Sequence, residues 1–237
     1  MVTLQGVSSI ITIITLLIAY CISVAVAGAF RAWTAYKMGD ETGQALGFLT
    51  LSPLAHIDLF GLAFLFVFQF GWGRHIPINP LNIHGPSRTL RMCAAYLSDT
   101  FAHLAVATIG MFTLLVGFGT RVLELVIPMV RFGVMSHTYI AQEYTASSSL
   151  AVSLMFIIIA IVYLNVVLAA LSFIISGFGL LTIFLLERYP EYWRYRNYLF
   201  LLVPMLLILF FSYPLRLFVL WIISTIGFML AYFVNLV

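Results

Sequence analysis

Residues 150–186 read LAVSLMFIIIAIVYLNVVLAALSFIISGFGLLTIFLL, a run of 37 residues without a charged side chain. A helix needs about 20 apolar residues to cross the hydrocarbon core of a bilayer, which is roughly 30 Å thick. This run therefore predicts a transmembrane segment, and it is too long for one straight crossing. The sequence S-G-F-G at 176–179 predicts a break, after which the span continues at an angle. Ser172 and Ser176, one turn apart, are expected to bond backbone carbonyls at this bend.

The composition of the whole chain agrees with a membrane location. Of its 237 residues, 63% are hydrophobic and 8% are charged, and the mean hydropathy is +1.12. Soluble domains are about 45–50% apolar and about 25% charged, so this chain could not present a wetted surface around one core. The net charge of +3 comes from scattered residues with no basic run. We therefore expect no nucleic-acid partner.

Further apolar segments predict an all-α, multi-pass membrane protein with about six transmembrane segments in a single membrane domain, residues 1–237. The expected spans are 8–30, 54–72, 94–118, 150–186 with its break, 198–211 and 215–237. No basic residue precedes the first span, so we expect a retained helix and not a cleaved signal. Between the first two spans, the sequence F-L-T-L at 48–51 predicts a short β-strand or re-entrant element.

The polar stretch after the first span carries a family resemblance. Its elements, in order, are A-W at 32–33, G-D-E-T at 39–42, G-F-L-T-L-S-P-L-A-H-I-D-L-F-G at 47–61, F-G-W at 70–72 and I-P-I-N-P at 76–80. Residues 31–80 resemble the compact bacterial site-2 proteases, which are intramembrane zinc metallopeptidases, with the spacing nearly intact. In that family a helix ending H-E-x-x-H-A-W precedes these elements. The resemblance implies the family's membrane fold and a place in the bacterial cytoplasmic (inner) membrane.

The zinc-binding residues of the family are replaced in this chain. Two histidines four apart share a helix face and can both bind zinc, and the glutamate beside the first acts as general base on the zinc-bound water. The resemblance places Ala27, Gly28 and Arg31 at these positions. Alanine and glycine offer no ligand, and a protonated arginine repels a dication. The family's third ligand, an aspartate, aligns with Leu180, and no aspartate follows Asp99. We therefore expect no catalysis and no cofactor.

Four ionisable residues in or beside the apolar segments form a candidate polar cluster: His56, Asp58, Asp99 and His103. Asp99 and His103 are four apart and share one helix face. They could form a replacement metal site, a proton relay or a buried pair that holds helices together. His56 and Asp58 match family positions that are not metal ligands, so we expect structural roles for both.

These observations favour a non-catalytic, site-2-protease-like subunit, a pseudoprotease, that binds other integral membrane proteins and supports assembly or regulation of a membrane complex. A sheet edge can capture an extended peptide by main-chain hydrogen bonds. The candidate partner-binding strand is Gly47, Phe48, Leu49, Thr50 and Leu51. Lipids are the other expected contacts. Two alternatives stay open: a transport or channel subunit that uses Asp99 and His103, and an active membrane metallopeptidase with a divergent site.

Overall fold

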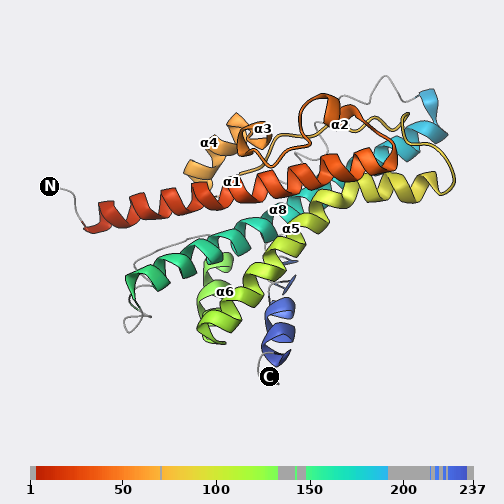
Figure 1. Ribbon diagram of the computed structural model, residues 1–237. Helices are drawn as coiled ribbons and strands as arrows, with labels where there is room; N and C mark the ends of the chain where they lie inside the picture. The colour runs from red at the N-terminus through yellow and green to blue at the C-terminus, as the bar shows by residue number, and fades with distance from the viewer. Residues whose placement is uncertain are drawn as a thin grey trace.

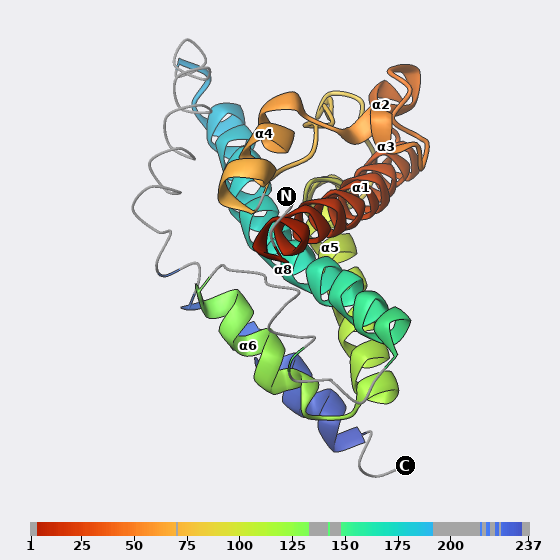
Figure 2. The same ribbon diagram turned by 90° about the vertical axis from the view of Figure 1, so that its left-hand side faces the viewer.

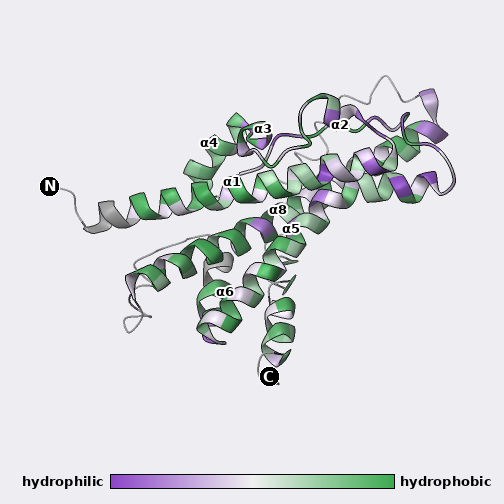
Figure 3. Ribbon diagram, viewed as in Figure 1, coloured by the Kyte–Doolittle hydropathy of each residue, from purple (hydrophilic) through white to green (hydrophobic). Residues whose placement is uncertain are grey.

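Three long helices dominate the computed structural model of the chain (Figure 1). The structure describes residues 4–69, 71–132, 142, 148–191, 214, 217–218, 221–222 and 224–233. Within these residues, three helices are long and apolar enough to cross a membrane: α1 (Leu4–Met38), α5 (Arg88–Phe118) and α8 (Ser149–Arg188). Figure 3 shows hydrophobic residues along most of each, with hydrophilic residues gathered where α1 ends and α5 begins. The fold is therefore that of a helical membrane protein, and the described residues contain three candidate spans of the six or so that the sequence predicts for the whole chain.

Helices α5 and α8 pack along each other, and α1 lies against both (Figure 2). Tyr20, Met111 and Phe156, one from each helix, are almost completely buried between them. α5 approaches α8 closely at Gly110, where a Cβ would lie 2.8 Å from Cγ2 of Val162. The absence of a side chain at Gly110 thus sets the helix spacing, as small residues do in other membrane helix pairs.

Helix α8 is one uninterrupted helix of 40 residues, so the predicted break at 176–179 is wrong. A glycine costs a helix about 1 kcal/mol relative to alanine but, unlike proline, it removes no backbone hydrogen bond. Much of α8 is buried against α1 and α5, which offsets the cost of Gly177. The helix begins where the Ser148 side chain accepts a hydrogen bond from the Ala151 amide (3.2 Å).

The chain between α1 and α5 folds back along α1 as short helices and loops (Figure 1). The helices are α2 (Thr42–Ala45), α3 (Pro53–His56) and α4 (Leu59–Phe68). α4 has 10 residues, or about 15 Å, and ends where Gln69 takes up a left-handed conformation with φ of +60°. The predicted span 54–72 is therefore wrong, because its helix is too short to cross the bilayer.

The predicted strand at 48–51 is also wrong, and no strand is present among the described residues. Residues 47–51 form turns and bends instead. Gly47 has a φ of +79°, which glycine adopts far more readily than other residues. The Thr50 amide donates to the carbonyl two residues earlier (2.9 Å), and the Thr50 carbonyl lies 2.7 Å from Nε2 of His56. These bonds use backbone groups that a strand would offer to its neighbour.

Asp40 is fully buried and ties the loop before α5 to the end of α1. Its carboxylate accepts hydrogen bonds from the Thr42 amide (3.2 Å) and hydroxyl (2.6 Å), the Asn79 amide (2.8 Å) and Nδ2 of Asn82 (2.8 Å). Four donors compensate for taking the charge out of water. The G-D-x-T element therefore has a structural role here.

We expect Asp40→Asn to lower the free energy of unfolding by about 2–4 kcal/mol, because the new NH₂ group would face donors and leave some of them unpaired. Chemical denaturation in detergent measures this change. Glu41→Gln, at the exposed neighbouring residue, is the matched control and should change it by less than about 0.5 kcal/mol. Equal effects of the two variants would contradict the anchoring role of Asp40.

The predicted span 198–211 lies outside the described residues. Of the predicted span 215–237, the structure describes an apolar helix over Ser224–Phe233. This helix meets α6 (Val122–Phe132) where a Cβ on Gly227 would lie 2.7 Å from Cδ2 of Leu123. The contact joins the described end of the chain to the helix that follows α5.

Candidate functional site

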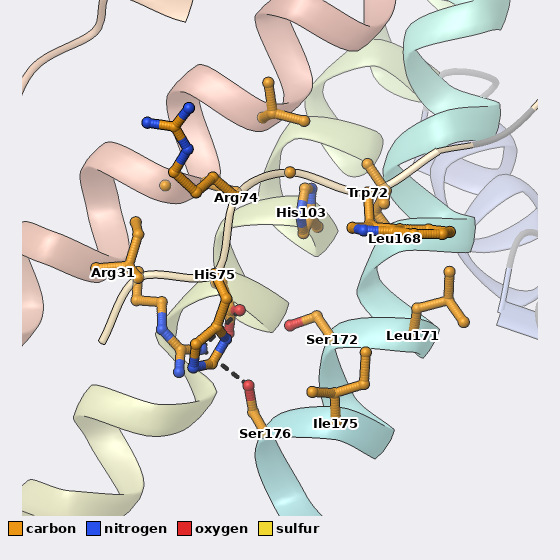
Figure 4. Close-up of a pocket in the computed structure, with 16 residues that line it drawn as sticks. Arg31, Trp72, Arg74, His75, His103, Leu168, Leu171, Ser172, Ile175 and Ser176 are labelled. Carbon is orange, nitrogen blue, oxygen red and sulfur yellow. Dashed lines mark hydrogen bonds and ion pairs between the residues drawn. The ribbon is translucent and has the colours of Figure 1, made fainter. Parts of the chain in front are cut away.

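A cavity of about 500 Å³ lies where α1, α5 and α8 meet, beneath the loop at residues 72–76 (Figure 4). The helices supply one face each to its wall. The lining residues are Val24, Ala27, Gly28 and Arg31 from α1, Asp99 and His103 from α5, and Leu168, Leu171, Ser172, Ile175 and Ser176 from α8. Its volume falls within the range of about 300–1,000 Å³ that holds small-molecule ligands in proteins.

The guanidinium of Arg31, on α1, contacts both α5 and α8 at one end of the cavity. Its Nη1 lies 2.7 Å from Oδ2 of Asp99, 2.8 Å from Oγ of Ser176 and 3.1 Å from the Tyr96 carbonyl. Its Cζ also lies 5.7 Å from the centre of the Tyr96 ring, a cation–π distance. The Arg31 residue is only 3% exposed. A buried charge is tolerated when it is paired and hydrogen-bonded, and this one has both kinds of partner.

His56 lies against Gly28 and leaves no room for a side chain there. His56 is buried, and its Nε2 lies 2.7 Å from the Thr50 carbonyl, which assigns the ring proton to Nε2. Its Nδ1 has no hydrogen-bond partner in the described part of the chain and points at Gly28, where a Cβ would overlap this nitrogen. The glycine is therefore a packing requirement of the His56 ring.

A second polar contact joins the same three helices nearby. Nδ1 of His103 lies 2.8 Å from Oδ1 of Asn165, and Nδ2 of Asn165 donates to Oγ of Ser23 (2.7 Å) and to the Ile161 carbonyl (2.8 Å). Asn165 is fully buried. These hydrogen bonds join α1, α5 and α8, so the network stabilises the helix packing.

The structure brings together some of the sequence-predicted residues and separates others. Asp99 and His103 line the same cavity, each bonded to a different partner, whereas His56 and Asp58 do not line it. Asp58 caps α4, where its Oδ1 accepts a hydrogen bond from the Gly61 amide (2.8 Å). The four residues therefore do not share one site.

Leu180, which the family resemblance aligns with the third zinc ligand, does not line the cavity. Leu180 packs with Ala35 and Met92 in a separate apolar cluster, away from the cavity wall. Ser176, one turn earlier, faces Arg31 instead, and Ser172 Oγ lies 2.8 Å from Thr100 Oγ1. The expectation that these serines bond backbone carbonyls is wrong. Their i, i+4 spacing was the available signal, because it places both on one helix face.

The loop that covers the cavity adds one cation, Arg74, and one residue that could carry a positive charge, His75. Burial and the charge of Arg31 lower the pKa of His75 to about 4, with Asp99 acting in the opposite direction, so the ring is neutral at pH 7. By its accessible surface His75 is an exposed residue, and it also lines the cavity. Arg74 belongs to neither of the two ion pairs found among the described residues. Arg31, Arg74 and Asp99 together therefore give this site a formal charge of +1.

The residues of the cavity do not suit the zinc ion that the family resemblance implies. Zinc sites use three or four His, Cys, Asp or Glu side chains. In the described part of the chain, no three such side chains lie close enough to hold a metal ion. The positions aligned with the family's ligands present a methyl group at Ala27 and a paired cation at Arg31. A dication placed beside that guanidinium would be repelled.

Part of the chain is similar to a bacterial protein. It is 38% identical over 84 residues to "Putative zinc metalloprotease YwhC" of Bacillus subtilis (strain 168). The match covers 35% of this chain and 37% of that protein, so the chain spans little more than a third of the length of this relative. No family model matches the chain, and no solved structure matches it. The likeness supports a site-2-protease-like relationship for the matched part.

Proposed function

We propose that this chain is a non-catalytic relative of the site-2 proteases, a multi-pass protein of the bacterial cytoplasmic membrane. One observation carries the proposal. The position aligned with a zinc-binding histidine holds Arg31, whose guanidinium is committed to Asp99 and Ser176 at 2.7 and 2.8 Å. A metal ion and this ion pair cannot share the space. The three helices are therefore held together at this point by an ion pair in place of metal coordination.

The position of the general base supports the same proposal. A glutamate beside the zinc-bound water is needed to take its proton. Gly28 stands at that position, and the His56 ring occupies the volume a side chain would need. Restoring the base would require moving a buried histidine that is bonded to the Thr50 carbonyl. The loss of the base is thus built into the packing of the surrounding chain.

We expect the purified chain to hold no stoichiometric zinc and to cleave no membrane peptide. Elemental analysis after dialysis against a chelator measures the first, and incubation with a fluorescent transmembrane peptide in detergent measures the second. YwhC, purified and treated in the same way, is the comparison protein. One equivalent of retained zinc together with cleavage would overturn the proposal and favour an active metallopeptidase with a divergent site.

In place of cleavage, we propose that the chain binds other integral membrane proteins through an apolar groove beside α1. The groove has a volume of about 570 Å³ and is lined by Val26, Ala29, Phe30 and Trp33 from α1 and by Leu49, Thr50 and Leu51 from the following loop. Trp33 is 46% exposed and Leu51 is 68% exposed. In a bilayer, where lipid also covers apolar surface, a hollow of this kind favours a partner helix by close packing. Since residues 47–51 form no strand, the contact is made by side chains and not by strand addition.

We expect Leu51→Glu to reduce recovery of the partner at least about tenfold, because it places a charge in an apolar interface at a cost of more than about 1.4 kcal/mol. Affinity purification from native membranes, followed by quantification of the co-purifying chains, measures the recovery. Leu54→Glu is the matched control, since Leu54 is 79% exposed and does not line the groove. If both variants retain the partner equally at equal abundance, the binding surface lies elsewhere.

A further inference from the structure

Two nitrogens of the buried Arg31 guanidinium have no hydrogen-bond partner among the described residues. Nη1 makes the hydrogen bonds with Asp99, Ser176 and Tyr96, whereas Nε and Nη2 are both buried and unpaired there. Nε and Nη2 form one edge of the planar guanidinium, and their N–H groups point in parallel. This edge is the fork with which arginine binds both oxygens of a carboxylate. Leaving such donors unpaired in a buried place is costly, so the fork marks a place for an acceptor.

The surroundings of the fork favour an anionic group attached to an apolar chain. Arg31 and Arg74 outnumber Asp99 around the cavity, and His75 is neutral at pH 7, so one negative charge would balance the site. Leu168, Leu171 and Ile175 of α8 form an aliphatic stretch along one side of the wall, which also contains Trp72, His103 and Ser172 (Figure 4). The ring of His75 lies at the guanidinium in the same view. A head group would reach the fork when this ring turns aside.

We propose that the cavity binds a single-chain amphiphile with a carboxylate head, such as a long-chain fatty acid of the surrounding membrane. The carboxylate pairs with the fork of Arg31 and is attracted by Arg74, and the hydrocarbon chain lies against the aliphatic side of α8. A transmembrane helix is about 10–12 Å across, so a cavity of about 500 Å³ suits a single chain better than a whole helix. This binding does not depend on whether the chain cleaves peptides or on what fills the groove at Leu49–Leu51.

Native mass spectrometry of the full chain released from detergent tests the proposal with three ligands: oleic acid, its methyl ester and acetate. Wild type is expected to bind oleic acid at least tenfold more tightly than the ester, which has the same chain without the charge, and than acetate, which has the charge without the chain. Equal binding of acid and ester would overturn the proposal. Equal binding of acetate would mean that a small free carboxylate, and not an amphiphile, is the ligand.

Matched variants locate the site. Arg31→Lys keeps the charge but removes the fork, and is expected to weaken oleic acid binding at least tenfold. Arg74→Gln, at an exposed residue, is expected to weaken it by less. Lys37→Gln, on the same helix but outside the cavity, should bind as wild type does. Ile175→Trp should fill the cavity and abolish binding, whereas Phe173→Trp, which is 54% exposed and outside this cavity, should not. If Ile175→Trp is folded, by its unfolding midpoint, and still binds oleic acid, the cavity is not the site.

Discussion

Arg31→Met is expected to lower the free energy of unfolding by about 3–5 kcal/mol. The substitution removes the cation and leaves the Asp99 carboxylate, 18% exposed, without its ion-pair partner in the helix crossing. An uncompensated buried charge is far more costly than the loss of the attraction itself. The loss is measured by chemical denaturation in detergent, followed by the fluorescence of the tryptophans.

Two further variants test whether this loss of stability comes from breaking a buried ion pair. The double variant Arg31→Met, Asp99→Leu removes both charges, and it should regain most of the lost stability because apolar side chains of similar volume can replace a buried pair. Arg88→Met breaks the exposed pair with Glu187 (2.8 Å, side chains 33% and 40% exposed), and should cost less than about 1 kcal/mol. If the double variant is as unstable as Arg31→Met alone, the unpaired charge of Asp99 is not the cause of the lost stability.

Gly28→Ala is expected to destabilise the chain by about 3 kcal/mol, although alanine is otherwise the better helix former. Its Cβ would overlap Nδ1 of His56, and the ring cannot retreat without losing its bond to the Thr50 carbonyl. Gly117→Ala on α5 is the control. No atom of the described residues lies within 4 Å of a Cβ built there, so the same substitution should stabilise by up to about 1 kcal/mol.

Removing the histidine should relieve the overlap at Gly28. In a double-mutant cycle, the cost of Gly28→Ala should be smaller when His56→Ala is already present. It follows that Ala27→His, Gly28→Glu and Arg31→His combined should reduce the folded yield and produce no protease. If this triple variant folds, binds zinc and cleaves a peptide, the placement of the family motif on Leu180 and the packing argument are both wrong.

The long apolar helices were predictable, because a local count of apolar residues is enough to find them. Their ends were not. The sequence prediction ended the first span at residue 30, since Arg31 is charged, yet α1 runs on to Met38. The guanidinium is neutralised by Asp99, which lies 68 residues later in the chain. No local pattern records a pairing at that separation, so the buried arginine was interpreted as a boundary.

The prediction of a strand at 48–51 was wrong for a related reason. Alternating side chains at 48–51 are typical of a strand, but the His56 ring takes the Thr50 carbonyl and the turn at Gly47 redirects the chain. On α8, the family alignment reached Leu180, one turn beyond Ser176, which is the residue that faces Arg31. The two positions lie on nearly the same helix face. The contact of Ser176 with Arg31 joins residues 145 positions apart, so the sequence alone could not show it.

The Arg31 ion pair also constrains the order in which the protein can be made. α1 is synthesised before α5 and α8, and an arginine in a membrane helix disfavours insertion, by about 2.5–3.5 kcal/mol at the helix centre and by less toward the end of the helix, where Arg31 lies. Its partners Asp99 and Ser176 emerge 68 and 145 residues later. At 5–20 residues per second, the second delay is about 7–29 seconds. During that interval α1 must be sheltered by the insertion machinery or held near the bilayer surface, and a nascent chain cut short before α8 would expose this incomplete charge pairing to membrane quality-control proteases.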